Sequence, residues 1–199
     1  LNTFVGAFEA QYGWSSGLLL SFSTYAGWIS IGGIILYGWL AKRKGARATA
    51  IVALSLATVG MLVWSRAVSP AMYFLGVVLC SCSASAIMII RDNTTNNWFP
   101  TKKGLAMGWV TMGPLLATAS ILYLINWGGK KFGFHGYFDV IALAFLILLL
   151  IVIFWFRDYP EDKGCYPDND RSVSKERVME LHEKGLKFSE KALEELRVM

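Results

Sequence analysis

An unbroken apolar run from Val140 to Phe154 is the feature that most constrains how this chain can fold. It belongs to a longer stretch that has the roughly 20 residues a helix needs to cross the hydrocarbon core of a bilayer. Lipid offers no partners to backbone N–H and C=O groups, so a spanning segment must be a helix or part of a closed barrel. Barrel strands alternate apolar and polar residues, and this run does not. The predicted spans are residues 14–41, 48–65, 71–97, 104–126 and 137–156.

Charge is unevenly distributed along the chain. Charged residues make up 17% of the sequence, whereas soluble domains carry about 25%. Between Ala48 and Ile90 the only charged residue is Arg66, while the final segment is crowded with charge. We therefore expect an all-α, polytopic membrane protein with a water-exposed tail over 157–199. Residues 1–8 are too short to span and are interpreted as the end of a truncated first helix, which makes six helices.

The basic residues between the predicted spans indicate an orientation. Short cytoplasmic loops collect Lys and Arg, and external loops do not. The tail is therefore predicted to lie in the cytoplasm, beneath the plasma membrane. One set of loops holds ten basic residues and the other holds three: Lys42, Arg43, Lys44, Arg47, Lys102, Lys103, Arg157, Lys163, Arg171 and Lys175 against Arg66, Lys130 and Lys131.

The predicted span over 71–97 is the polar one. Ionisable and amide groups at membrane depth are costly, so they normally face protein or a water-filled cavity. One interpretation is a helix that lines a cavity, with Arg91 in a charge role for substrate binding or gating. The other places the Arg91 head group in water at the cytoplasmic interface, and the sequence leaves both open. The candidate residues are Arg91, Asp92, Asn93, Asn96 and Asn97.

Residues 38–47, between the first two predicted spans, resemble the signature loop between the second and third helices of the major facilitator superfamily. The loop residues are Gly38, Lys42, Arg43, Gly45 and Arg47. The family has an aspartate where this chain has Lys42. In the family that acid takes part in a charge network that gates the cytoplasmic side. One hypothesis is that Asp92 replaces it by pairing with Lys42 or Arg43.

Residues 97–108 resemble the junction between helices four and five of the same family. The similarity is closest to branches that carry organic anions, such as oxalate/formate antiporter-like and sugar-phosphate permease-like proteins. The later pair Gly113 and Pro114 partly matches the family's antiporter motif and predicts a bend. Close helix packing is the alternative reading of these small residues. The junction residues are Trp98, Pro100, Gly104 and Gly108.

The resemblance implies the N-terminal six-helix half of a facilitator fold, with its first helix truncated. In that fold helices one and four line the path, and the substrate binds between two halves near the bilayer midplane. The implied function is alternating-access transport of a small solute, an organic anion, by an antiporter or proton-coupled carrier. The implied partners are that solute, the lipid bilayer and the missing C-terminal half. A non-transporting receptor or membrane scaffold is the alternative.

Other chemistry is not indicated by the sequence. Cys80 and Cys82 lie in an apolar segment and Cys165 lies in the tail, so neither a disulfide nor a zinc site is expected. His135 and His182 are far apart, and no catalytic set or phosphate-binding loop appears. We therefore expect no enzyme activity, cofactor, metal site or nucleic-acid partner. Residues 174–199 are predicted to form a mixed-charge amphipathic helix in the loop that joins the two halves.

Overall fold

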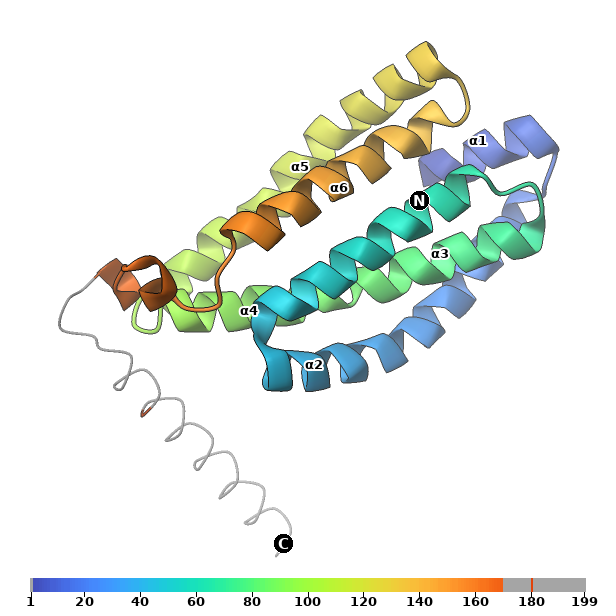
Figure 1. Ribbon diagram of the computed structural model, residues 1–199. Helices are drawn as coiled ribbons and strands as arrows, with labels where there is room; N and C mark the ends of the chain where they lie inside the picture. The colour runs from blue at the N-terminus through green and yellow to red at the C-terminus, as the bar shows by residue number, and fades with distance from the viewer. Residues whose placement is uncertain (1, 170–179, 181–199) are drawn as a thin grey trace, which may run out of the picture.

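The computed structural model describes residues 2–169 and residue 180, and helices make up most of this part of the chain (Figure 1). Within residues 2–169 there is no β-strand, which confirms the predicted all-α class. The amphipathic helix predicted over 174–199 lies outside the described residues, apart from Glu180. The α-helices are α1 Asn2–Tyr12, α2 Ser16–Ser65, α3 Pro70–Ala84, α4 Ala86–Trp98, α5 Lys103–Phe132 and α6 Gly136–Trp155, followed by 3-10 turns η1 Pro160–Lys163 and η2 Pro167–Asn169.

The longest helix, α2, consists of two arms that meet at Gly45. The backbone there has φ 84° and ψ 174°, a conformation that is essentially restricted to glycine. Figure 1 shows the second arm, residues 46–65, folding back from this turn. At the start of the first arm, the Ser15 hydroxyl accepts the Leu18 N–H at 3.4 Å, as an N-cap does. The arms occupy the two stretches that the sequence separates into 14–41 and 48–65.

The polar span of the sequence contains two helices, α3 and α4, which are divided at Ser85. The Ser85 hydroxyl donates to the Cys82 carbonyl at 2.6 Å. Pro70 stands in the first turn of α3, where its missing N–H has no cost, and Ser69 caps that turn. Together α3 and α4 are long and apolar enough to cross a membrane as one span, Pro70–Trp98.

Small residues bring α3 close to the second arm of α2. A Cβ on Gly76 would lie 2.7 Å from the Trp64 Cβ and 2.8 Å from its Cα, so the two backbones are nearly in contact. Nearby, the buried Ser83 hydroxyl donates to the Ala53 carbonyl at 2.6 Å. Small residues with one interhelical hydrogen bond are the usual means of packing helices in lipid.

The last two long helices, α5 and α6, form an antiparallel pair (Figure 1). Gly128 and Gly136 allow their close approach, since a Cβ on Gly128 would lie 2.6 Å from the Gly136 carbonyl oxygen. The helix α5 is longer than the predicted 104–126, so Lys130 and Lys131 lie in its last turn instead of in a loop. The most apolar part of α5 contains no buried residue, although Ile125 near the end of the helix is buried in the core.

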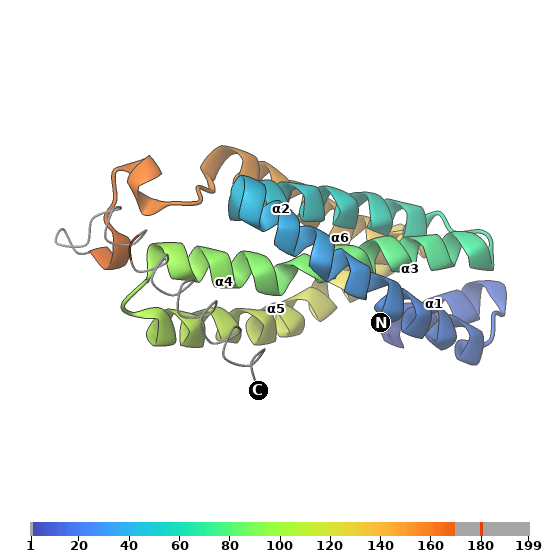
Figure 2. The same ribbon diagram turned by 90° about the horizontal axis from the view of Figure 1, so that it is seen from below.

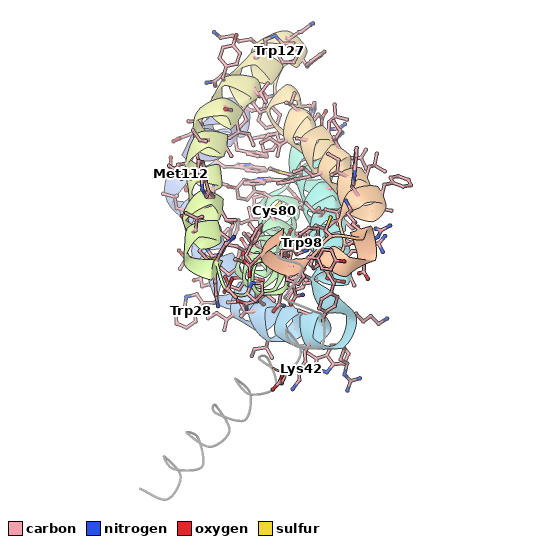
Figure 3. All side chains as sticks on the ribbon, turned by 90° about the vertical axis from the view of Figure 1, so that its left-hand side faces the viewer. Trp28, Lys42, Cys80, Trp98, Met112 and Trp127 are labelled. Atoms are coloured by element: carbon pink, nitrogen blue, oxygen red, sulfur yellow. The ribbon has the colours of Figure 1, made fainter. Side chains whose placement is uncertain are left out.

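The helices define two ends of one bundle. The basic end contains the Gly45 turn, the end of α4, the start of α5 and the end of α6, while the opposite end contains α1, the α2–α3 connection and the α5–α6 turn (Figure 1). Figure 3 shows Lys42 and Trp127 at these two ends. Among the described residues, four helical segments are long and apolar enough to cross a membrane: Ser16–Ser65, Pro70–Trp98, Lys103–Phe132 and Gly136–Trp155.

An aromatic cluster closes the opposite end. Phe8 of α1 is fully buried at its centre. Its ring centroid lies 4.8 Å from that of Tyr73 and 4.9 Å from that of Phe134, both in edge-to-face geometry, which is the arrangement aromatic rings prefer. Phe138 of α6 and Trp14, before α2, complete the contacts. The cluster packs α1 against α3, α6 and the connections that precede α2 and α6.

Candidate functional site

The polar residues of α4 lie at the basic end, and all but the buried Thr95 are half-buried. The Arg91 Nε donates to the Asp92 carboxylate at 3.0 Å, so Asp92 pairs with its neighbour along the chain. It does not pair with Lys42 or Arg43, contrary to the hypothesis raised by the signature loop. The Arg43 guanidinium instead lies 4.5 Å from the centre of the Trp39 ring, a favourable cation–π contact.

The signature loop is held by an acidic residue that follows α6. The Asp158 carboxylate accepts the Arg47 N–H at 2.7 Å, and its Oδ2 would lie only 2.5 Å from a Cβ on Gly45. The Arg47 guanidinium donates a hydrogen bond of 2.6 Å to the carbonyl of Ile153, near the end of α6. The turn therefore needs glycine both for its φ angle and for the approach of Asp158. Lys42 is exposed at the same end.

The end of α4 is attached to the segment that holds the loop. The Asn97 amide donates to the Asp158 carbonyl at 3.1 Å, and the Trp98 indole N–H donates to the Arg157 carbonyl at 3.3 Å. Asn97 and Trp98 thus have structural partners at the basic end. Asn93 and Asn96 are half-buried on the same helix. Asp158 is consequently the residue that connects the Gly45 turn to α4, a role the sequence did not assign to it.

A second acidic residue after α6 caps the start of α5. Asp168 is buried, and its carboxylate accepts the Thr101 N–H at 2.8 Å, the Thr101 hydroxyl at 2.7 Å and the Lys102 N–H at 3.1 Å. The residue preceding α5, Lys102, makes no side-chain cap of its own. A carboxylate at a helix N-terminus satisfies free N–H groups and is favoured by the helix dipole.

Opposing effects act on the pKa of Asp168. Burial raises it, whereas the hydrogen bonds from Thr101 and Lys102 and the Lys102 charge lower it, and the net result is a pKa below the usual 3.8. The folded pKa is therefore lower than the unfolded one. The stability that this carboxylate contributes is fully present above the unfolded value, and it is lost as the pH falls through the folded value.

Replacement of Asp168 by Asn is expected to lower the free energy of unfolding by about 1–2 kcal/mol at pH 7, because the amide is uncharged and only one of its two polar atoms can accept the hydrogen bonds that the carboxylate accepts. The difference from the wild type should shrink as the pH falls below 4, because the wild-type carboxyl then becomes protonated too. Thermal unfolding in detergent across this pH range measures both effects. Asp162→Asn is the matched control, since its carboxyl is outside the cap. A difference that stays constant with pH would contradict the assignment.

The glycines of the junction and the predicted bend lie on exposed surface, whereas Trp98 and Pro100 are half-buried. Pro100 is in the short connection between α4 and α5, and Cβ atoms on Gly104, Gly108 and Gly113 would meet nothing within 4 Å. The helix α5 continues through Pro114, and the Thr118 hydroxyl donates to the Pro114 carbonyl at 2.7 Å. In the described structure these glycines are therefore not at sites of close helix packing.

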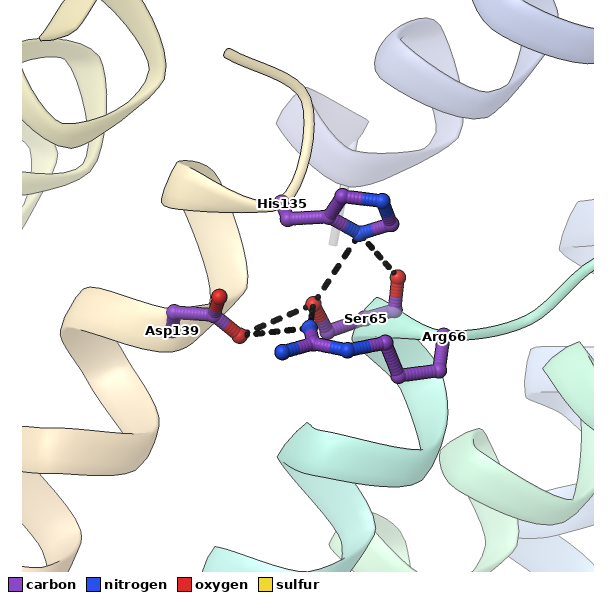
Figure 4. A network of polar contacts seen from close by, with 4 residues as sticks. All are labelled: Ser65, Arg66, His135 and Asp139. Carbon is purple, nitrogen blue, oxygen red and sulfur yellow. Dashed lines mark hydrogen bonds and ion pairs between the residues drawn. The ribbon is translucent and has the colours of Figure 1, made fainter. Parts of the chain in front are cut away.

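A polar network at the opposite end was missed by the sequence reading (Figure 4). Arg66 and Asp139 form an ion pair of 2.9 Å, and the buried Ser65 hydroxyl donates to the same carboxylate oxygen at 2.9 Å. His135 Nδ1 lies 2.7 Å from the Ser65 carbonyl. The signal in the sequence was the isolation of Arg66 and Asp139 as single charges within or beside apolar stretches.

Comparison with known proteins identifies the family. The Major Facilitator Superfamily model matches residues 1–196. An oxalate:formate antiporter of Oxalobacter formigenes is 33% identical over 96 residues, covering 48% of this chain and 22% of that protein. A choline/ethanolamine transporter of Danio rerio is 26% identical over 189 residues, covering 76% of this chain and 37% of that protein. No solved structure matches.

The chain thus spans between about a fifth and two fifths of the length of these relatives. The match extends over both the apolar helices and the tail, so it does not depend on one motif. It confirms the relationship that the signature loop and the helix junction predicted. This polytopic, all-α membrane chain belongs to the Major Facilitator Superfamily.

Proposed function

We propose that this chain is part of a carrier that moves a small organic anion across the plasma membrane by alternating access, as an antiporter or proton-coupled transporter. It supplies the N-terminal six helices, with α1 as the end of the first, and the basic end faces the cytoplasm. The substrate binds between this half and a C-terminal half that the chain does not include. Family membership and the oxalate:formate antiporter among the relatives support this proposal.

The main structural support for an anionic solute is the position of Arg91. Its side chain is 26% exposed and lies in a helix that is otherwise suited to crossing the bilayer. A cation at such a place is costly unless it has a function or a partner. Asp92 is that partner in this structure, and its own side chain is 47% exposed. An anionic solute that reaches Arg91 would compete with Asp92, so binding would be coupled to the breaking of one ion pair.

The second relative favours a different solute. The Danio rerio protein carries choline and ethanolamine according to its name, and both are cations or become cations at neutral pH. A cationic solute would pair with Asp92 instead of with Arg91. The ion pair therefore offers a partner to a solute of either charge. Separate substitution of Arg91 and of Asp92 distinguishes an anionic solute from a cationic one.

The test is uptake by the full-length protein in proteoliposomes, with labelled oxalate, formate, a sugar phosphate and choline as solutes. For an anion carrier we expect Arg91→Ala to reduce uptake at least tenfold, because a hydrogen bond to a charged group is worth about 1.5–3 kcal/mol. Lys130→Ala, at the opposite end, should leave uptake unchanged. Stimulation by solute inside the vesicle would indicate exchange.

Other outcomes would redirect the assignment. Saturable choline uptake that depends on Asp92 and not on Arg91 would establish the cationic alternative. If folded protein moves none of these solutes, a receptor or scaffold function would replace transport. The exposed Lys42 at the position of the family's aspartate would then become the feature to explain.

A further inference from the structure

An exposed ridge runs along the first arm of α2 and ends in a cation. Its members follow each other at four-residue steps, so they form one row on the helix surface: Ile31, Ile35, Trp39 and Arg43. All four side chains are exposed, and Ile35 is the most exposed at 74%. Figure 2 shows this arm crossing in front of the other helices, on the outside of the bundle. The described helices therefore leave the ridge uncovered.

Trp39 and Arg43 form the polar end of this ridge. The Arg43 guanidinium lies 4.5 Å from the centre of the Trp39 ring, which is an attractive cation–π contact. Tryptophan is enriched where a spanning helix passes from the acyl chains to the head groups, because its ring is apolar and its N–H is polar. The pair therefore lies at the level of the lipid head groups, with the apolar part of the ridge at the level of the acyl chains.

The charge of Arg43 has no acidic partner in the described part of the chain. The helix α2 contains no acidic residue, and neither of the two described ion pairs includes Arg43. At the adjacent turn, the Asp158 carboxylate accepts the Arg47 N–H. By contrast, Arg66 at the opposite end of the bundle is paired with Asp139. A basic residue at the membrane surface that is not neutralised within the protein attracts anionic lipids.

We propose that this ridge binds an anionic glycerophospholipid, with the phosphate on the Arg43 guanidinium, the ester region beside Trp39 and one acyl chain along Ile35 and Ile31. A guanidinium is planar and can give a phosphate two parallel hydrogen bonds. The ridge combines a cation with an apolar surface of several residues, which matches a lipid and not a small soluble anion. The site concerns a lipid and not the solute, so it does not depend on the proposed transport.

The test measures fluorescence quenching by brominated phospholipids in vesicles that contain the full-length protein. The vesicles are phosphatidylcholine with a fixed fraction of brominated phosphatidylglycerol or brominated phosphatidylcholine that has the same acyl chains. The contribution of Trp39 is the quenching that disappears in Trp39→Phe. We expect phosphatidylglycerol to occupy the site about fivefold more than phosphatidylcholine, which corresponds to the value of about 1 kcal/mol for one basic residue near head groups. Equal quenching by the two lipids would overturn the proposal.

Variants assign the preference to Arg43, with the Trp39 contribution measured in each of them. Arg43→Gln should remove the preference for phosphatidylglycerol, whereas Arg43→Lys keeps the charge and should retain part of the preference. Lys103→Gln is the matched control, because it removes the same charge from the start of α5 and should keep the preference. An equal loss in the two glutamine variants would indicate diffuse attraction of lipid to the whole basic end, and it would overturn a site at Arg43. Thermal unfolding confirms that each variant is folded.

Two further measurements test the occupant of the ridge. Added salt should reduce the preference for phosphatidylglycerol, because exposed charges are screened, and a preference that does not change with salt would contradict the contact between Arg43 and the phosphate. If neither brominated lipid quenches Trp39, the ridge is covered by protein in the full-length chain, which overturns the lipid proposal. Because quenching needs neither a solute nor a gradient, these results stand whether or not the protein transports any solute.

Discussion

Replacement of Gly45 by Ala is expected to lower the free energy of unfolding by about 2–3 kcal/mol. At φ 84° and ψ 174° the backbone is in a region that costs a residue with a Cβ about 1–3 kcal/mol. The new methyl group would also lie 2.5 Å from the Asp158 carboxylate, so the hydrogen bond to Arg47 must move. Thermal unfolding of the purified protein in detergent measures the loss.

Gly38→Ala is the matched control within the same loop. A Cβ on Gly38 meets nothing within 4 Å and stands in the first arm of α2. Alanine is the better helix former, by up to about 1 kcal/mol, so this variant should be neutral or slightly stabilised. Comparison of the double variant Gly45→Ala, Asp158→Ala with the single variant Asp158→Ala separates the two causes, since these two proteins differ only in the backbone strain. Equal effects of the two glycine substitutions would show that the turn does not require glycine.

Truncation of Phe8 to Ala is expected to cost about 3 kcal/mol, the lower limit for removing a buried aromatic side chain. Phe8 is fully buried and contacts rings from α1, α3 and α6 and from the connection before α2. Its removal leaves a cavity that neighbouring rings fill only in part. The transition temperature in detergent, measured by intrinsic tryptophan fluorescence, reports the loss.

Phe154→Ala provides the comparison, because Phe154 of α6 is 74% exposed. Its loss leaves no cavity and should change the stability of the detergent-solubilised protein by less than about 0.5 kcal/mol. Phe8→Leu should retain part of the stability, because it keeps most of the volume and loses only the ring geometry. If Phe8→Ala unfolds at the wild-type temperature, α1 is not fastened to the bundle through this cluster.

The sequence predicted the all-α class because the signals of a helix are local. The apolar run of α6, the capping serines before α2 and α3 and the prolyl residue in the first turn of α3 each act within one or two turns. The boundaries between consecutive helices are harder to predict from local signals. Ser85 divides α3 from α4 without a proline or glycine, so a single span over 71–97 was the natural expectation. Lys130 and Lys131 are charged, so the predicted span ended before them, whereas α5 includes both in its last turn.

The pairing of polar residues depended on contacts between distant parts of the chain. Gly45 and Arg47 were recognised from their motif, but the carboxylate that holds them is Asp158, 111 residues after Arg47. Asp168 caps α5 from 67 residues beyond Thr101, and Asp139 meets Arg66 across 73 residues. In each case several acids in the sequence were equivalent candidates. The expected partner for Lys42 or Arg43, Asp92, pairs with Arg91 instead.

The sequence by itself determined the class of this protein, its family and the residues whose chemistry is unusual for a membrane segment. Those properties follow from the length of apolar runs, the cost of charge in lipid and motifs within about a dozen residues. The tertiary structure alone decided which charged residues in the described part of the chain pair with each other. It brought the end of α6 against the Gly45 turn. Electrostatic partners are fixed by distance in space, and that distance exists only once the helices have packed.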